Sequence, residues 1–452
     1  MREFWSLDFV RKYMRVFASL LFVLLLFVGC SDSPQGNKSI ADLKMSQNAL
    51  DYLPKTRTPP LSPQEVERLK ENYLKKFFAP FLGLTPNPNI AEVFWIKSSL
   101  EKNLGYGENL KPISPKMTQK ILQDMQIPLY PNATQMAIVI KDCDVRAVPS
   151  VHPRLSKPNG FPFDRWQNSM IFYGTPVLIT HYDTSKRYAH IQTEFVYGWV
   201  DVSHLALVSP KQAQTLSSLK HFIVPKNDES IIKDWRGDYV TQARIGKLFA
   251  LAENNNIFIY KRQSDGKLRI EKTAINLSEF DTFPQAFSQE KVAEYINAMM
   301  GRQYGWGGLY EERDCSAFIR DIFSNFALYL PRNSYAQGNF GTRQINLANL
   351  DSLQKEKVLL ANATPFGSVL YLKGHIMLYL GEDKEGRAIV AHSAWSVMAG
   401  DFWRKDEYRL GGVVITTLKP ANEYNGAWGS RKTLGDRVLL VNDLYKAMQE
   451  GQ

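Results

Sequence analysis

The spacing of apolar residues changes twice along the chain, and each change predicts a different kind of structure. Residues 62–130 repeat apolar positions such as Val66 and Leu69 every three or four residues, which is typical of helices that bury one face. From residue 137 the apolar runs become short and are separated by turn residues, which predicts strands. Beyond residue 286 helical spacing returns and short strands follow it.

The middle region predicts two small β-barrels in succession, because short strands at regular spacing are typical of such barrels. The strand-like runs of its first half are residues 137–140, 176–179, 188–191 and 197–200. Those of its second half are residues 242–246, 248–251, 257–260 and 268–270. One larger β-domain is the alternative.

The last region predicts an α+β domain. A helix is expected over residues 292–300, and a second helix begins at about Cys315 and carries its apolar residues at helical spacing. The strands expected after them are residues 368–372, 375–380, 388–392 and 412–417. Helices followed by an antiparallel sheet form an α+β layer arrangement.

Length and charge narrow these possibilities only a little. The chain has 452 residues, which suits two to four domains, and a formal net charge of +10. A basic surface suits any polyanion, including nucleic acid, membrane phosphate and an anionic cell wall. Because the charge is spread along the chain and no nucleic-acid motif occurs, we expect no nucleic-acid partner.

The N-terminus predicts export. A basic segment ending at Arg15 precedes an apolar run over residues 17–28, which is shorter than the ~20 residues of a membrane span. Cys30 follows this run and resembles the lipidated cysteine of a bacterial lipoprotein box, although Phe27 stands where Leu is usual. An uncleaved N-terminal anchor is the alternative.

We therefore expect residues 1–29 to be a lipoprotein signal peptide and Cys30 to be the lipidation site. Residues 30–60 are rich in Ser, Asp, Asn, Lys and Pro, which predicts a tether. The protein is then exported and lipid-anchored to a bacterial membrane, and it faces the periplasm or cell wall.

Cys315 is the candidate nucleophile. It is one of three cysteines, with Cys30 and Cys143, and nothing in their contexts indicates a disulfide framework. A thiol at a helix N-terminus faces the positive end of the helix dipole, which stabilises the thiolate, whereas Asp314 partly opposes this effect. A buried structural cysteine is the alternative.

His375 and His392 are the candidate partners of this thiol. They lie on the two arms of a predicted hairpin whose turn covers residues 382–386, and the midpoint between them falls in that turn. A symmetric hairpin places the two imidazoles side by side, so that one can act as a base which the other orients. Zinc binding is the rival use, but neither Cys-x-x-Cys nor His-Glu-x-x-His occurs, and we expect no metal and no cofactor.

Several stretches of the last region together resemble the NlpC/P60 family of cysteine peptidases. They are Tyr304-Gly-Trp-Gly-Gly308, Arg313-Asp-Cys-Ser-Ala317, Leu330-Pro-Arg-Asn-Ser334 with Gln337, Gly374-His-Ile-Met-Leu-Tyr-Leu-Gly381 and His392-Ser393. Ala317 departs from the Gly that is usual in the family.

This resemblance implies a papain-like fold and a role for each matching residue. Cys315 is then the nucleophile, His375 the general base, His392 the orienting third member, and Tyr304 helps to hold the oxyanion. The resemblance also implies that the substrate is contacted by Asp314, Ser316, Trp306 and Gln337.

The region upstream resembles the same multidomain group. Asp144-Val-Arg-Ala-Val-Pro-Ser150 and Tyr197-Gly-Trp-Val200 are similar to its first bacterial SH3 domain. The domains expected on this basis are an N-terminal helical segment at 61–135, SH3-like barrels at 136–215 and 216–285, and the NlpC/P60 peptidase at 286–452.

The resemblance implies a peptidoglycan hydrolase that cuts stem peptides between γ-D-Glu and a diamino acid such as diaminopimelate. It also implies a preference for a free N-terminal L-Ala, because the first SH3 domain of such enzymes narrows the cleft. We expect a monomer whose partners are stem peptides and, through the lipid, a membrane. The alternatives are an amidase or acyltransferase on the same scaffold, and a catalytically silent wall-binding lipoprotein that acts through its SH3 domains. A nucleic-acid binder, motivated only by the positive charge, comes third.

Overall fold

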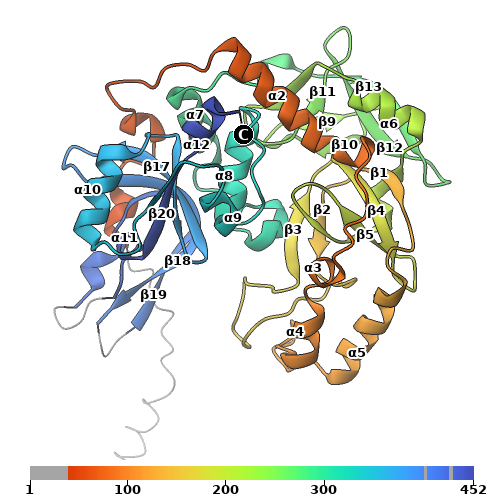
Figure 1. Cartoon of the computed structure of the whole chain (residues 1–452), viewed down its shortest axis with the longest axis horizontal. Helices are drawn as coiled ribbons and strands as arrows, with labels where there is room; N and C mark the ends of the chain where they lie inside the picture. The colour runs from red at the N-terminus through yellow and green to blue at the C-terminus, as the bar shows by residue number, and fades with distance from the viewer. Residues whose placement is uncertain (1–38, 402–404, 427–430, 452) are drawn as a thin grey trace, which may run out of the picture. The chain divides into compact units, whose positions relative to one another are not determined.

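In the computed structural model, which describes residues 39–401, 405–426 and 431–451, the chain folds in the predicted order (Figure 1). A helical segment comes first, two small SH3-like β-domains follow, and an α+β domain of the papain-like type ends the chain. The predicted signal peptide and Cys30 lie outside the described residues. Among the described residues, no helix combines the length and the apolar content that a membrane crossing requires.

Residues 40–60, which we expected to belong to a tether, lie along the α+β domain. Asp42 accepts hydrogen bonds from the backbone N–H and the hydroxyl of Thr417 (2.7 and 2.8 Å). Gln47 bonds both backbone groups of Ile415 (2.8 and 2.9 Å), which belongs to the edge strand β19 (Lys405–Thr417). This part of the chain therefore covers a sheet edge that would otherwise be open.

The N-terminal helices begin where the sequence places capping residues. Ser62 and Glu65 form a reciprocal capping box at the start of α2 (Pro63–Phe77), whose Leu69 and Tyr73 are buried. The remaining helices of this segment are η1 (Ala41–Lys44), η2 (Ala49–Tyr52), η3 (Ala79–Phe81), α3 (Ile90–Val93), α4 (Lys97–Lys102), α5 (Pro115–Asp124) and η4 (Ile127–Leu129).

The first SH3-like domain is a seven-stranded antiparallel sheet with the order β3-β2-β6-β5-β4-β1-β7. Its strands are β1 (Gln135–Val139), β2 (Cys143–Arg146), β3 (Gln167–Ile171), β4 (Pro176–Tyr182), β5 (Tyr188–Gln192), β6 (Tyr197–Asp201) and β7 (Leu205–Leu207). The four strands predicted from periodicity are confirmed. Strands β2, β3 and β7 were not predicted from periodicity.

The second SH3-like domain consists of small sheets that follow α6 (Pro210–Ser217). Its strands are β8 (Phe222–Pro225), β9 (Ile231–Lys233), β10 (Tyr239–Gln242), β11 (Phe249–Ala250), β12 (Asn256–Arg262), β13 (Leu268–Ala274) and β14 (Phe280–Phe283). Residues 242–246 were predicted as a strand, but only Gln242 is in one. The rest form a loop, in which Gly246 has a left-handed φ of +94°.

The last domain packs helices on a sheet with the order β15-β20-β16-β17-β18-β19. Its helices are α7 (Gln289–Met299), η7 (Trp306–Glu311), α8 (Cys315–Ser324), α9 (Ser334–Gly338), α10 (Ser352–Asn362), η8 (Asn422–Tyr424), α11 (Leu434–Arg437) and α12 (Leu444–Gln449). Its further strands are β15 (Gln344–Asn346), β16 (Ser368–Leu372), β17 (His375–Glu382), β18 (Ala388–Gly400) and β20 (Val438–Asp443). Helix α8 is buried against β17 and β18, so its first residue is held beside both strands.

Candidate active site

Cys315 is the first residue of α8, and the sequence around it explains its position. Asp314 caps the helix by accepting a hydrogen bond from the backbone N–H of Ala317 (2.8 Å). The apolar face behind the thiol, including Phe318 and Ile322, is fully buried. Cys315 is itself only 7% exposed, so the thiol is held at a fixed place at the end of a packed helix.

The environment keeps the Cys315 thiol protonated at neutral pH. Burial, reinforced by the charge of Asp314, raises the pKa of Cys315 to about 12. Backbone N–H groups of Ile376 and Ser316 bond the sulfur and act in the opposite direction. The stabilisation of the thiolate expected from the helix N-terminus is therefore outweighed by burial. Because Ile376 lies on β17, its contact also places the sulfur beside the strand that begins with His375.

The two histidines form a hydrogen-bonded pair next to this helix end. His375 Nε2 lies 2.8 Å from His392 Nδ1, and the ring centroids are 5.0 Å apart. His392 Nε2 lies 3.2 Å from the hydroxyl of Thr416 on β19, and His392 is fully buried. The structure thus brings Cys315, His375 and His392 together at one place.

The histidines meet diagonally across the hairpin and not directly opposite each other. Leu378 pairs with Ala391, and continuing this register places Met377 opposite His392. The symmetric pairing that we predicted is therefore wrong by two residues, because a bulge after Tyr379 and a turn at residues 383–387, in place of 382–386, move the centre of the hairpin. His375 still shares a face with Met377, and diagonal neighbours lie within reach of a ring.

The hydrogen bonds select one tautomer for each histidine. The Thr416 hydroxyl donates to the carbonyl of Thr417 (2.8 Å), so it accepts from Nε2–H of His392. His392 Nδ1 then accepts from Nε2–H of His375, which leaves His375 Nδ1 without a proton. Burial, with the charge of Arg437, lowers the pKa of His375 to about 4, so the ring is a neutral proton acceptor at pH 7.

Tyr304 lies close enough to Cys315 for a thiolate charge to act on it. Burial first, and the charge of Cys315 second, raise the pKa of the Tyr304 phenol, which therefore keeps its proton. Its ring contacts those of Phe163 (centroids 6.5 Å) and Trp395 (6.2 Å). A neutral phenol near the sulfur can donate a hydrogen bond to a developing oxyanion.

Trp306 joins the peptidase domain to the first SH3-like domain. Its Nε1–H donates to the carbonyl of Asp164 (2.7 Å), and its ring meets that of Phe163 edge-on (5.1 Å). The Arg165 guanidinium lies 5.1 Å from the ring centroid. Trp306, predicted to contact substrate, therefore forms part of the wall between the two domains and remains partly exposed there.

Asp314 and Ser316, also predicted to contact substrate, form hydrogen bonds with each other and with Arg332. Asp314 accepts hydrogen bonds from the Ser316 hydroxyl (3.0 Å) and from both terminal nitrogens of Arg332 (2.8 and 3.1 Å). Burial alone would raise the pKa of Asp314, but Arg332 and these hydrogen bonds hold it below its usual range. Arg332 also donates to the hydroxyl of Ser169 (2.7 Å), so this ion pair extends to the first SH3-like domain.

Gln337 has a structural role in place of the predicted contact with substrate. It is fully buried, and its Nε2 donates to the carbonyls of Ser316 (2.9 Å) and Pro331 (2.8 Å). The side chain therefore ties the first turn of α8 to the segment before α9 and presents no surface to a ligand.

Cys143 lies apart from the site, and burial raises the pKa of its thiol well above the usual range. Within the described ranges, Cys143 and Cys315 are unpaired, and no three His, Cys, Asp or Glu side chains are grouped as metal ligands. Sequence reasoning assigned no role to Thr416 or Arg332. Arg332 lies inside the matching stretch that begins at Leu330, whereas Thr416 offered no signal beyond a hydroxyl in a predicted strand.

Models of protein families match four consecutive parts of the chain. They describe an N-terminal NLPC_P60 stabilising domain, an SH3 domain of the SH3b1 type, an SH3 domain of the SH3b2 type and the NlpC/P60 family, at residues 19–130, 153–201, 209–253 and 301–410. No curated protein sequence matches the chain significantly.

Solved structures were compared with the fold of this chain. An NlpC/P60 endopeptidase from Photobacterium damselae subsp. piscicida superposes with a TM-score of 0.77 at 20% identity, over 88% of this chain and 97% of that one. An NlpC/P60 family protein from Bacillus cereus has a TM-score of 0.42 at 14% identity, over 66% of this chain and 99% of that one. The first likeness shows a common fold. With the matching family models and the assembled Cys315, His375 and His392, the chain carries an NlpC/P60 cysteine endopeptidase domain, matched at residues 301–410, behind two SH3 domains.

Proposed function

We propose that the protein hydrolyses the amide between γ-D-Glu and a diamino acid in peptidoglycan stem peptides, and that it favours peptides with a free N-terminal L-Ala. The observation that carries this proposal is the chain of hydrogen bonds from His375 through His392 to Thr416, beside Cys315 in an NlpC/P60 domain. It supplies a nucleophile and an oriented base, which amide hydrolysis requires.

In the proposed mechanism, His375 Nδ1 takes the thiol proton while the sulfur bonds the carbonyl carbon of γ-D-Glu. Both groups are neutral at pH 7, so proton transfer accompanies the attack and does not precede it. Tyr304 donates to the oxyanion. The C–N bond then breaks as His375 returns the proton to the leaving amine. Water, deprotonated by the same ring, finally cleaves the thioester and regenerates the thiol.

The wall formed by the first SH3 domain supports a preference for short peptides. Trp306 is tied to the backbone of Asp164, and the ring of Phe161 lies 5.8 Å from that of Trp395 on β18. Material that extends beyond this side of the site would meet the SH3 domain. A peptide that ends there, with its terminal amine free, suits such a wall.

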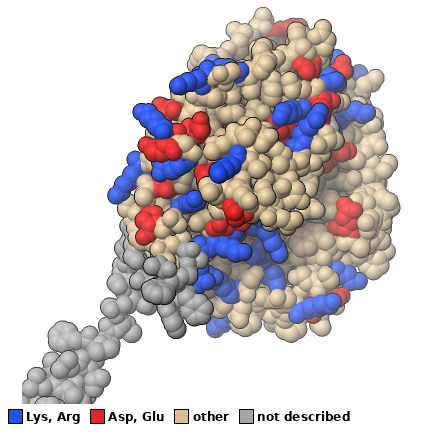
Figure 2. Space-filling view, turned by 60° about the vertical axis from the view of Figure 1, so that its left-hand side comes forward, with Lys and Arg blue, Asp and Glu red and all other residues tan. Residues whose placement is uncertain are grey.

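The charge of the surface agrees with an acidic substrate. In the view of Figure 2, Lys and Arg side chains gather around a hollow in the surface. Stem peptides carry several carboxylates, and a basic surface raises the local concentration of such ligands.

The test is mass spectrometry of digests of L-Ala-γ-D-Glu-diaminopimelate, either free or capped by N-acetylmuramic acid. Residues 31–452 are compared with the Cys315→Ala variant, which we expect to keep the fold and lose all hydrolysis. Release of diaminopimelate from the free peptide alone would support both parts of the proposal. Cleavage of both substrates would contradict the preference for a free N-terminal L-Ala. Hydrolysis by the Cys315→Ala variant would show that Cys315 is not the nucleophile.

Cleavage of neither substrate would favour the alternative, a wall-binding lipoprotein that acts through its SH3 domains. The assembled Cys315, His375 and His392 argue against this alternative, because a silent domain has no need of an oriented base.

We also propose export and lipid anchoring through Cys30, which rests on the basic and apolar pattern of the N-terminus. The Cys30→Ser variant should move from the membrane fraction to the soluble extracytoplasmic fraction when cells are fractionated. Unchanged partitioning would contradict lipidation.

A further inference from the structure

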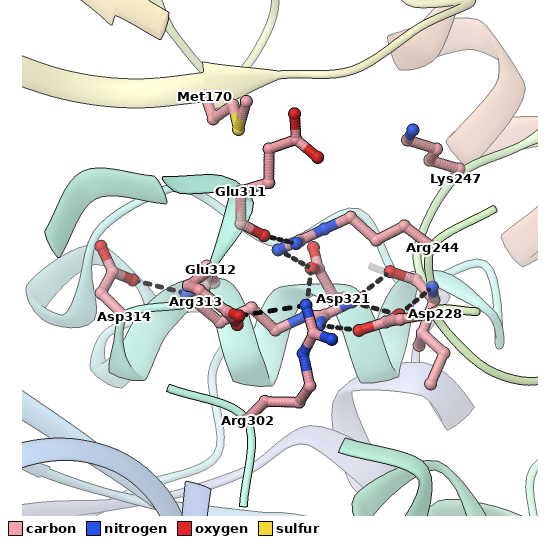
Figure 3. A network of polar contacts seen from close by, with 12 residues as sticks. Met170, Asp228, Arg244, Lys247, Arg302, Glu311, Glu312, Arg313, Asp314 and Asp321 are labelled. Carbon is pink, nitrogen blue, oxygen red and sulfur yellow. Dashed lines mark hydrogen bonds and ion pairs between the residues drawn. The ribbon is translucent and has the colours of Figure 1, made fainter. Parts of the chain in front are cut away.

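Arg313, two positions before Cys315, is completely buried and forms ion pairs with residues of two domains. Arg313 donates to both carboxylate oxygens of Asp228, which belongs to the second SH3 domain, and one of these contacts measures 3.0 Å. Its Nε–H donates to Asp321 of α8 (2.7 Å). Figure 3 shows the guanidinium between the two carboxylates. The charge of Arg313 holds the pKa of Asp228 at about 2 although burial would raise it, so the pair is ionised.

Arg244, from the same SH3 domain as Asp228, completes a network of two positive and two negative side chains. Arg244 donates to Asp321 (3.0 Å) and to the backbone carbonyl of Glu311. All four charged side chains are at most 7% exposed. The loop that carries Arg244 also lies against α8, because a Cβ on Gly246 would stand 3.0 Å from atoms of Asp321. The second SH3 domain thus contacts the catalytic helix and the segment before it.

The backbone of Arg313 connects the elements that carry the catalytic residues. Its carbonyl accepts hydrogen bonds from the hydroxyl of Ser393 (2.7 Å) and from the N–H of Gly305 (3.1 Å). Ser393 directly follows His392 on β18, and Cys315 stands two positions after Arg313. A displacement of Arg313 therefore changes the placement of the thiol relative to the histidine pair.

The segment in front of Arg313 has a backbone conformation that must be held from outside. Gly307 and Gly308 have positive φ, and so do Tyr310 and Glu311 (both +61°). A left-handed conformation is unfavourable for a non-glycine residue, and it persists where surrounding contacts determine it. Here the contact of Arg244 with the Glu311 carbonyl supplies such a restraint.

We propose that Asp228 and Arg244 are positioning residues, through which the second SH3 domain holds residues 305–314 and sets the place of Cys315 beside His375. The second SH3 domain is then part of the catalytic architecture, in addition to any binding role. This inference depends on the proposed function only where peptide hydrolysis is used to measure its effect.

The test compares two isosteric substitutions of buried, paired aspartates in the full chain. Asp228→Asn removes the charge opposite Arg313. Asp142→Asn is the matched control, because Asp142 also pairs with a buried cation, Lys247, and accepts one backbone N–H, from Tyr173 (2.7 Å). The other hydrogen bonds of Lys247 go to Thr241 and Gln242, and it interacts with Glu311 of residues 305–314 through charge alone.

Both variants should lower the melting temperature, but only Asp228→Asn should affect the chemistry. We expect kcat for the tripeptide to fall about tenfold or more, with KM little changed, because a small misplacement of a reacting group can cost up to ~100-fold. Alkylation of Cys315 by iodoacetamide, followed by mass spectrometry of its peptide, should slow in parallel. This second readout needs no substrate, so it stands even if the tripeptide is not cut.

Unchanged kcat and alkylation in Asp228→Asn, or an equal loss in Asp142→Asn, would overturn the proposal. If Asp228→Asn does not fold, the double variant Asp228→Asn with Arg313→Gln takes its place, because it leaves no uncompensated buried charge. We expect this double variant to regain stability while alkylation of Cys315 remains slow. Recovery of both properties together would show that the ion pair serves stability alone.

Discussion

The reactivity of the site depends on which nitrogen of each histidine carries its proton, and Thr416 decides this. Its hydroxyl donates to Thr417 and so presents a lone pair to His392. The consequence passes through His392 to His375, whose Nδ1 is left free to accept a proton. In the proposed mechanism, a residue of the neighbouring strand thus determines the tautomer of the base.

Thr416→Val should lower kcat about ten- to a hundredfold, because an orienting hydrogen bond to a buried group is worth ~1–3 kcal/mol and each 1.4 kcal/mol is about tenfold. Thr416→Ser keeps the hydroxyl and should retain most of the activity. Steady-state kinetics on the tripeptide distinguishes them. Equal activity of the Val and Ser variants would show that the hydroxyl has no orienting role.

Arg437→Gln should shift the acid side of the pH profile of kcat/KM to higher pH. Arg437 precedes Val438, which pairs with Leu372, and Leu372 pairs on its other side with His375. The positive charge of Arg437 helps to lower the pKa of His375, so its removal raises that pKa and protonates the base at a less acidic pH. Lys384→Gln, at the exposed turn of the β17–β18 hairpin, should leave the profile unchanged. An unshifted profile in both variants would contradict the role of Arg437.

At the scale of elements, the N-terminal segment and strand β19 stabilise each other. Gln47 forms hydrogen bonds with the backbone N–H and carbonyl of Ile415 at the sheet edge, and Asp42 accepts one from the N–H of Thr417. Helical periodicity could not predict this, because residues 40–60 contain no repeating apolar pattern. Their stability comes from contacts with a strand more than 350 positions later in the sequence.

Gln47→Ala should lower the free energy of unfolding by about 1–2 kcal/mol, because two partly buried hydrogen bonds are lost. Gln64→Ala replaces an exposed glutamine of α2 and should change stability little. Chemical denaturation of the two variants measures the difference. Equal midpoints would mean that water replaces Gln47 at the strand edge without loss.

The hairpin of β17 and β18 shows where prediction from local sequence ends. The two strands and the shared face of His375 and His392 followed from a period of two. The register did not, because a bulge after Tyr379 and a turn closed by Asp383 and Arg387 depend on packing against neighbouring strands. The loop after Gln242 is a similar case, since Arg244 acquires its role only where the loop meets α8.

For the whole molecule, buried neutral histidines should make stability sensitive to acid. Burial lowers the pKa of His190 to about 3 and that of His375 to about 4, below the usual value of 6.5. The unfolded chain binds protons below pH 6.5 that the folded chain refuses, so stability is complete above this pH and falls as the pH decreases. Asp228, with a pKa of about 2, adds a further loss only below about pH 4.

The melting temperature should therefore decrease between pH 6.5 and 4, before carboxylates titrate. Each buried histidine should contribute about 1 kcal/mol per pH unit. His190→Gln lies far along the chain from the active site and should flatten this slope, whatever its effect at pH 7. Calorimetry at a series of pH values is the measurement. A slope identical to that of the unchanged protein would exclude His190 as a contributor.

The sequence by itself determined the order of the domains, the α+β class of the last one, and the identity of Cys315, His375 and His392 as a set. These follow from periodicity, turn residues and local motifs, which depend on neighbours along the chain. The tertiary structure alone decided that burial raises the pKa of the Cys315 thiol and that Asp228 pairs with Arg313. It also decided that Asp314 bonds Arg332 and that Gln337 bonds the backbone of Ser316. Desolvation and ion pairing depend on which distant segments pack together, and no local pattern carries that information.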